Sequence, residues 1–157
     1  MSNHTEFIKI AVALSKEGSD NNKGGPFGCV VVKDGKIIGK GFNEVTSSND
    51  PTAHAEVVAI REACKNLNSF QLTGCELYTS CEPCPMCLGA IYWARPDKVY
   101  FANTRNDAAT AGFDDAFIYD EINVLPADRK IKMIHVPDEK AMDVFKNWIS
   151  KADKRSY

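Results

Sequence analysis

"CELYTSCEPCPMCLGAIYWARPDKVYFAN", residues 75–103, is the stretch of the chain that decides the fold. It opens with a short β-rich run, CELYTS, and passes through a cluster of cysteines and prolines into an apolar helical pattern, CLGAIYWAR. Pro96 stops that helix, and a second β-rich run, DKVYFAN, follows. A strand, a helix and a strand in this order obey the right-handed crossover rule, which leaves few topologies for the chain.

The flanking sequence supplies the remaining layers. The elements expected outside the central stretch are a helix over 5–17 that Thr5 can cap, a β-hairpin over 27–43 turning at Asp34-Gly35, a helix over 53–67 that Thr52 can cap, a short helix within 113–122, a fifth strand over 131–136 and a final helix over 138–153. This order predicts an α/β fold: a three-layer α/β/α sandwich around a five-stranded mixed sheet. No repeat or linker divides the chain, so we expect one domain over residues 1–157.

Composition narrows the class of protein. The 157 residues carry 19 basic and 21 acidic side chains, a formal net charge of −2, and no basic patch of the kind that grips nucleic acid. We therefore expect a small, roughly neutral substrate and no nucleic-acid partner. The N-terminal residues show no secretory signal, and no run is long and apolar enough for a membrane span, so we expect a cytoplasmic protein without a membrane partner.

The six cysteines need a chemical explanation. Thiols stay reduced in the cytoplasm, and Cys29, Cys64 and Cys75 stand alone in apolar contexts where cysteine packs as a small hydrophobic residue. The remaining three lie together in "CEPCPMC", residues 81–87. Taken alone, this heptapeptide allows a disulfide knot, an iron–sulfur cluster, a closed structural zinc site or half of a catalytic metal centre.

An upstream motif favours the catalytic metal centre. Cys84 and Cys87 lie three residues apart at a helix start, where the helix dipole lowers thiol pKa and both sulfurs can reach one zinc ion. "HAE", residues 54–56, begins the preceding helix, so that His54 can bind the same zinc while Glu56 reaches a water molecule without being a ligand. H-x-E followed by P-C-x-x-C is the signature of zinc-dependent nucleobase deaminases. The main alternative is a closed structural site that adds Cys81 as a fourth ligand.

With these motifs in hand, the chain resembles the cytidine deaminase superfamily, and within it the small bacterial guanine deaminases. The segments "GGPFG", "SNDPTAHAEV", "YTSCEPCPMCLGAIYWARP", "DAATAGFDD" and the terminal "SY" carry that resemblance over nearly the whole chain. It implies a five-stranded mixed sheet between helices and one Zn²⁺ per subunit. It also implies His54, Cys84 and Cys87 as zinc ligands, with water as the fourth, and leaves Cys81 outside the ligand set.

The same resemblance implies contacts with a purine. Asn43 would hydrogen-bond to the base, Asp115 would pair with its edge, and Asp114 would be a companion of Asp115. Phe27 would stack on the ring, and Ala55 would offer backbone contacts. Pattern alone also allows blander roles: Phe27 in the core, and Asn43 and the two aspartates as turn or capping residues.

The resemblance further implies a homodimer. In that family the C-terminal segment is swapped between subunits and closes the partner's site, so Trp93 and Tyr157 would reach a neighbour's substrate. Without the resemblance, Trp93 is expected to pack or lie at an interface, and Tyr157 is expected to be a disordered chain end.

The activity implied is the hydrolytic deamination of guanine to xanthine and ammonia. Zinc would activate water as hydroxide for attack at C2, and Glu56 would shuttle the protons to a ring nitrogen and the leaving amine. Other deaminase substrates remain open at this point: guanosine, cytosine, an aminotriazine or tRNA adenosine. A zinc-stabilised binding module without catalysis is the alternative from a different class.

Overall fold

A computed structural model describes residues 4–157, and the chain falls into two compact units that meet at the boundary between Asp115 and Ala116. The elements of the first unit are α1 (His4–Asp20), β1 (Gly28–Lys33), β2 (Lys36–Phe42), α2 (Val45–Ser48), α3 (Ala55–Leu67), β3 (Cys75–Cys81), α4 (Pro85–Ala94), β4 (Lys98–Asn103) and α5 (Arg105–Thr110). The second unit contains α6 (Ala116–Ile122) and α7 (Glu139–Ser150). No helix among the described residues is both long and apolar enough to cross a bilayer.

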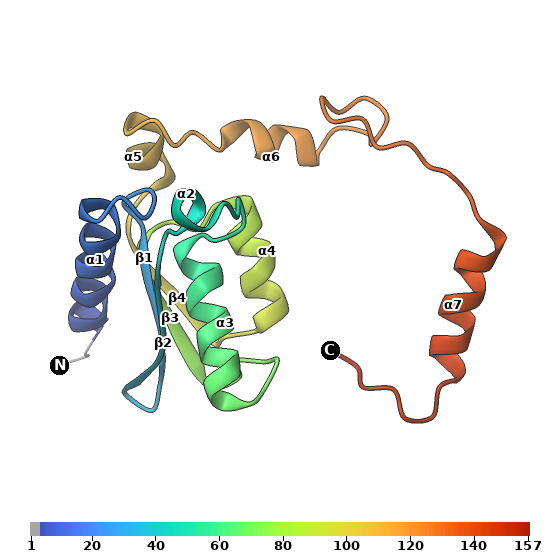
Figure 1. The fold of residues 1–157 in the computed structure, drawn as a ribbon, viewed down its shortest axis with the longest axis horizontal. Helices are drawn as coiled ribbons and strands as arrows, with labels where there is room; N and C mark the ends of the chain where they lie inside the picture. The colour runs from blue at the N-terminus through green and yellow to red at the C-terminus, as the bar shows by residue number, and fades with distance from the viewer. Residues whose placement is uncertain (1–3) are drawn as a thin grey trace. The chain divides into compact units, whose positions relative to one another are not determined.

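The sheet is mixed, as predicted. Its strand order is β2-β1-β3-β4, with β1 antiparallel to both neighbours and β3 parallel to β4 (Figure 1). The β1–β2 hairpin turns where expected, because Asp34 and Gly35 both take positive φ angles, 49° and 73°. Two consecutive residues at positive φ match the right-handed twist of the flanking strands.

Helices cover both faces of this sheet, which confirms the α/β/α layering (Figure 1). Side chains alternate along β1, so Val30 and Val32 face α1 while Cys29 and Val31 face α3. The α1 side of the core contains Phe7, Leu14, Val30, Val32 and Tyr78. The opposite core contains Cys29, Val31, Ala55, Ala59, Ala63, Leu72, Cys75, Leu77, Ile91 and Ala94. Small alanines on α3 let that helix lie close to β2, and this contact positions the residues at its first turn.

The expectation of five strands in this sheet is wrong: the described sheet has four. Residues 131–136 form no strand and belong to the second unit, in which no other described segment is a strand that could pair with them. Alternating apolar residues make a segment suited to a pleated surface, but a strand exists only where a neighbour accepts its backbone hydrogen bonds.

Two predicted helix caps are also wrong. Thr5 lies inside α1, which already includes His4. Thr52 does not cap α3, because its backbone N–H and its hydroxyl both donate to Asp50 Oδ1, at 2.8 and 2.7 Å. His54 takes the N-cap position of α3 instead. The N-cap of α3 thus lies two residues later than predicted, and this places the His54 side chain at the start of the helix.

Candidate metal centre and active site

The first turn of α4 presents two thiols. Cys84 is the N-cap of α4, Pro85 occupies its first turn, where a missing N–H costs nothing, and the backbone N–H of Cys87 donates to Cys84 Sγ at 3.5 Å. Cys84 therefore satisfies one of the free donors at the helix start while its sulfur stays at the helix mouth. The expected placement of both cysteines at one helix start is what the structure has.

The first turn of α3 brings a histidine to the same point. His54 has an extended backbone, with φ −70° and ψ 154°, so it lies outside the helical spiral that begins at Ala55. Helical spacing would separate His54 from Glu56 by about 200°. Because His54 is the N-cap, that separation does not apply, and both side chains reach the space beyond the helix end.

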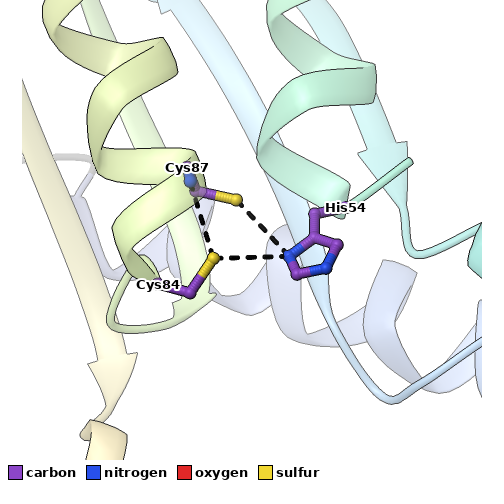
Figure 2. Close-up of side chains that lie close together, drawn as sticks. All are labelled: His54, Cys84 and Cys87. Carbon is purple, nitrogen blue, oxygen red and sulfur yellow. Dashed lines mark hydrogen bonds between the residues drawn. The ribbon is translucent and has the colours of Figure 1, made fainter. Parts of the chain in front are cut away.

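The three side chains fit one tetrahedral zinc ion. His54 Nδ1 lies 3.5 Å from Cys84 Sγ and 3.5 Å from Cys87 Sγ (Figure 2). Zn–S and Zn–N bonds of about 2.3 and 2.05 Å at a tetrahedral angle place nitrogen and sulfur about 3.5 to 3.6 Å apart. Nδ1 is thus the nitrogen aimed at the ion, a detail that no sequence pattern reveals.

The thiols are electrostatically unequal before a metal binds. The hydrogen bond from Cys87 lowers the pKa of Cys84 to about 4, whereas that bond and burial raise the pKa of Cys87. Cys84 is therefore a thiolate at neutral pH, whereas Cys87 keeps its proton, and its thiol donates to Glu56 Oε2 at 3.3 Å. Binding a cation displaces that proton, so the affinity for metal falls in acid.

Cys81 is not part of this group. Its Sγ contacts the carbonyl oxygen of Thr104 at 3.5 Å, and burial raises its pKa to about 11. His54, Cys84 and Cys87 are the only cluster of three or more potential ligands among residues 4–157. Three protein ligands leave one position of a tetrahedral ion for water or substrate. The closed four-ligand alternative is therefore not the arrangement observed. The cysteines of the described region are all free, so there is no disulfide knot either.

Glu56 is a buried carboxyl beside this cluster. The residue is only 5% exposed, Oε2 lies 3.3 Å from Cys87 Sγ, and Oε1 accepts a hydrogen bond from Thr79 Oγ1 at 3.0 Å. Burial raises the pKa of Glu56, which makes the carboxyl easier to protonate. A carboxyl that contacts the cluster of metal ligands without being a ligand itself is suited to proton transfer.

Asn43 follows β2 and lies at the same end of the sheet. Its Oδ1 accepts from the backbone N–H groups of Gly25 and Val45, at 3.3 and 3.2 Å, which fixes the amide orientation. Gly24 allows this approach, because a Cβ there would lie 2.1 Å from Asn43 Oδ1. Among residues 4–157 no hydrogen bond is made by the Asn43 NH₂, so this group is available to donate to a ligand.

An aromatic pair forms a further part of the site. The rings of Phe27 and Phe113 meet edge to face, with centroids 4.9 Å apart and an interplanar angle of 84°. Phe27, predicted to stack on a base, is half-buried and also packs against the α3 side of the core. Ala55, predicted to offer backbone contacts, is fully buried as the first residue of α3.

The other predicted substrate-binding residues, two aspartates and two aromatic residues, differ in burial and in location. Burial and, to a smaller extent, the charge of Cys84 raise the pKa of Asp115. Asp114 is exposed next to it. Trp93 is 64% exposed on α4, away from the described cluster's ligands, and Tyr157 belongs to the second unit.

Two residues of the site escaped the sequence prediction, Thr79 and Phe113. Thr79 follows Cys75 and Leu77 on the α3 side of β3, so a polar residue continuing an apolar face was an available signal. Phe113 had no such signal, because its partner Phe27 lies far away along the chain and only folding brings the rings together.

Comparison with known proteins agrees with this geometry. Residues 1–103 match the family described as the cytidine and deoxycytidylate deaminase zinc-binding region. Guanine deaminase of Bacillus subtilis (strain 168) is 57% identical over 155 residues, 99% of each chain. A tRNA-specific adenosine deaminase of Aquifex aeolicus (strain VF5) is 38% identical over 146 residues, 92% of this chain and 93% of that one.

Solved structures extend the comparison. The X-ray structure of guanine deaminase from Bacillus subtilis has a TM-score of 0.97 at 56% identity, over 99% of each chain. Another relative, solved in complex with 2,6-diaminopurine, has a TM-score of 0.69 at 30% identity, over 73% of this chain and 64% of that one. The predicted zinc cofactor and the predicted superfamily are thereby confirmed. The chain belongs to the cytidine and deoxycytidylate deaminase family of zinc-binding enzymes.

Proposed function

We propose that this chain deaminates guanine to xanthine and ammonia, with zinc held by His54, Cys84 and Cys87. One observation carries the proposal: the buried Glu56 carboxyl lies 3.3 Å from a cysteine of the cluster and is not among its ligands. A structural zinc site has no use for such a group, and burying a carboxylate costs stability. The catalytic alternative therefore explains Glu56, and a binding module does not.

The residues divide the chemistry as follows. When bound, zinc supplies Lewis-acid activation of water, which lowers the pKa of that water toward neutrality. Glu56 accepts a proton from the water as its oxygen bonds to C2 of the base. Glu56 delivers that proton to a ring nitrogen, then takes the second proton of the former water from the new C2 hydroxyl and passes it to the amine. The C2–N bond breaks, and ammonia leaves as C2 becomes a carbonyl. Positioned acid–base catalysis of this kind contributes about 10²- to 10⁴-fold.

Recognition of the base is assigned to the residues around Asn43. Its NH₂ group faces away from the two backbone donors that hold Oδ1, so it can donate to an acceptor of the purine. Phe27 and Phe113 supply an apolar surface for a flat ring. Asp115 would accept from the ring N–H and amino groups of the base. Asp114 and Ala55 complete the proposed contacts.

Deamination of adenosine in tRNA is a second candidate, because a tRNA-specific relative is 38% identical over 92% of this chain. The formal charge of −2 argues against it, since binding a phosphate backbone needs a basic surface.

The experiment is ammonia release from guanine, guanosine, cytosine and a tRNA anticodon stem by zinc-loaded protein. We expect turnover of guanine that Glu56→Gln lowers by roughly 10²- to 10⁴-fold while one zinc per chain remains bound. Turnover of the tRNA stem in place of guanine contradicts the proposed substrate. A Glu56→Gln protein that still works near the wild-type rate contradicts the proposed mechanism.

We also propose a homodimer in which residues 116–157 of one subunit complete the other. No residue of this segment is buried, and three of its apolar side chains, Ile131, Ile134 and Val136, are each at least 80% exposed. Exposed apolar surface of this kind is typical of a protein–protein interaction site, so we expect a second subunit to bury it. Segment 131–136 would add the fifth strand to β4 of a partner, and Tyr157 and Trp93 would then approach the partner's substrate.

The two edges of the sheet support this choice of β4. On β2, the backbone N–H of Lys40 donates to Glu62 Oε2 at 2.6 Å, and Asn66 Nδ2 donates to the Ile38 carbonyl at 2.9 Å. Side chains of α3 thus occupy the outer hydrogen-bonding groups of β2. Within the part of the chain that the structure describes, no such side-chain bonds cover the outer edge of β4, which leaves it able to accept a strand.

Complementation between two inactive variants tests the swap. Glu56→Gln lacks the proton carrier but keeps its tail, and Tyr157→Ala keeps the carrier but lacks the terminal ring. If tails are exchanged, refolding the two together restores up to one working site per mixed dimer. A tail that closes its own subunit's site gives no recovery, and a monomeric solution mass contradicts the dimer itself.

A cytoplasmic location is part of the same proposal. All six cysteines are free, including the buried Cys29 and Cys75, which is the state expected in a reducing compartment. Expression in the oxidising periplasm should lower the zinc content, because Cys84 and Cys87 can be oxidised to a disulfide there before they bind the metal. Full zinc loading in both compartments would remove this support.

A further inference from the structure

A buried hydroxyl on β3 lies directly behind Glu56. Thr79 is fully buried, in line with Cys75 and Leu77 on the face of β3 that packs against α3. A buried hydroxyl costs stability unless it is hydrogen-bonded, and valine would fill nearly the same space at no such cost. The polar group at this position therefore needs a reason.

The contacts of the hydroxyl supply that reason. Thr79 Oγ1 lies 3.0 Å from Glu56 Oε1 and 3.4 Å from the carbonyl oxygen of Gly28. One hydroxyl has one hydrogen to donate, and an ionised carboxylate is the stronger acceptor as well as the nearer one. Thr79 therefore donates to Glu56 Oε1.

This bond divides the two oxygens of Glu56. Oε1 is held against the sheet, and Oε2 is the oxygen that lies 3.3 Å from Cys87 Sγ, on the side of the metal cluster. The terminal torsion of a glutamate side chain is broad and has no single preferred value. Without a hydrogen bond to Oε1, the carboxylate would rotate about this torsion, and Oε2 would no longer be held on the side of the metal cluster.

We infer that Thr79 is a positioning residue for the reaction: its hydroxyl anchors Glu56 Oε1 so that Oε2 faces the reacting groups. The inference rests on the proposed role of Glu56. The geometry serves both stages of proton transfer. While Glu56 holds a proton on Oε2, Oε1 is a carbonyl oxygen that still accepts the hydrogen bond from Thr79, so the anchor is kept.

Matched variants separate positioning from packing. Thr79→Val keeps the shape and removes the hydroxyl, Thr79→Ser keeps the hydroxyl, and Ser80→Ala removes a neighbouring buried hydroxyl that accepts from the Gly28 N–H at 3.0 Å. Within residues 4–157 no hydrogen bond joins Ser80 to Glu56, so we expect its loss to affect stability and not the orientation of Glu56. All variants are made in the full chain and measured after zinc loading.

We expect Thr79→Val to lower kcat by roughly 10- to 100-fold, as is typical when the partner orienting a catalytic group is removed, with KM within about twofold. Thr79→Ser should recover kcat to within about threefold, since it restores the donor. Ser80→Ala should keep the wild-type kcat. Zinc content should stay at one per chain throughout, because none of these side chains is in the ligand cluster.

A double variant makes the inference refutable independently of the proposed function. If Thr79 acts through Glu56, Thr79→Val has no further effect on residual turnover in the Glu56→Gln background. A wild-type kcat in Thr79→Val, a loss that Ser does not rescue, or additive losses in the double variant each overturn the positioning role. If guanine is inert but another of the four substrates reacts, the proposed substrate fails, and the same comparison on that substrate decides the role of Thr79. Release of ammonia from none of them overturns both.

Discussion

Gly41 sets how closely α3 approaches the sheet, and replacing it should damage the metal centre. The residue lies on β2 beneath the first turn of α3. A Cβ added there would lie 2.8 Å from the carbonyl oxygen of Ala55 and 2.8 Å from Val58 Cβ. Ordinary van der Waals contact begins near 3.4 Å. In Gly41→Ala the start of α3 must therefore retreat by about 0.6 Å, since both of its neighbours are on that helix.

That displacement is large for a metal site. His54 directly precedes α3 and moves with it, whereas ligand distances tolerate deviations of only about 0.2 Å. A misplacement of about 1 Å in an active site can cost about 10²-fold in rate. For about 0.6 Å we expect a roughly tenfold loss of kcat and a comparable loss of zinc affinity. Overpacking should lower the free energy of unfolding by about 1 to 3 kcal/mol.

Two other glycines act as controls. Gly89 lies on α4, where an added Cβ meets nothing within 4 Å, so Gly89→Ala should keep zinc affinity and raise helix stability by up to about 1 kcal/mol. In Gly39→Ala the Cβ would lie 2.4 Å from the Ala59 carbonyl, one turn further along α3. That variant should lower the free energy of unfolding more than Gly41→Ala does. For each kcal/mol of stability lost, however, it should lose less zinc affinity.

The assays are zinc competition against a chromogenic chelator, ammonia release, and urea unfolding of the same samples. Zinc affinity and turnover at wild-type levels in Gly41→Ala, with the expected loss of stability, would refute the reasoning. They would show that α3 absorbs the added methyl group without moving His54.

Three further outcomes follow from the site. Burial raises the pKa of Glu56, so the folded wild-type protein loses stability as pH rises above the unfolded value of about 4.3. In zinc-free protein, the stability of Glu56→Gln relative to wild type should therefore be greater at pH 8 than at pH 3, and a urea-unfolding gap that is equal at both would count against this. Cys81→Ala should keep one zinc per chain by metal analysis, whereas Cys87→Ala should weaken zinc binding by at least roughly 10²-fold; equal losses would place Cys81 among the ligands. Phe113→Ala should raise KM roughly 3- to 10-fold through loss of the aromatic contact, with unchanged zinc content, and an unchanged KM would remove Phe113 from the substrate surface.

Most of the first unit could be predicted from local pattern. The hairpin at Asp34-Gly35, the apolar alternation of β1 and the proline that opens α4 each reflect sterics or hydrogen bonding within a few residues. The motif spacing pointed to His54, Cys84, Cys87 and Glu56 in the same way, because helix starts expose side chains and backbone donors that suit metals and anions. The caps at Thr5 and Thr52 failed because several residues competed for each helix start and the sequence does not rank them.

The remaining errors concern pairing between segments far apart in the sequence. Residues 131–136 have the composition of a strand, but a strand needs an edge, and no described strand of their own unit supplies one. The sequence pattern predicted no role for Thr79 or Phe113, because each of them acts through a single partner that is distant in the sequence. The Thr79–Glu56 bond joins residues 23 apart, and the Phe27–Phe113 contact spans most of the first unit.

By itself, the sequence determined the order of the strands and of the longer helices from β1 to β4, though not the short α2, and the residue types of the zinc cluster, because turns and alternation depend on neighbouring atoms. Only the tertiary structure decided that His54 offers Nδ1, that Cys81 turns to Thr104, and that Thr79 holds one oxygen of Glu56. These outcomes depend on how α3 and α4 pack on the sheet. Packing is set by the shapes of side chains that are distant in sequence, which no short motif contains.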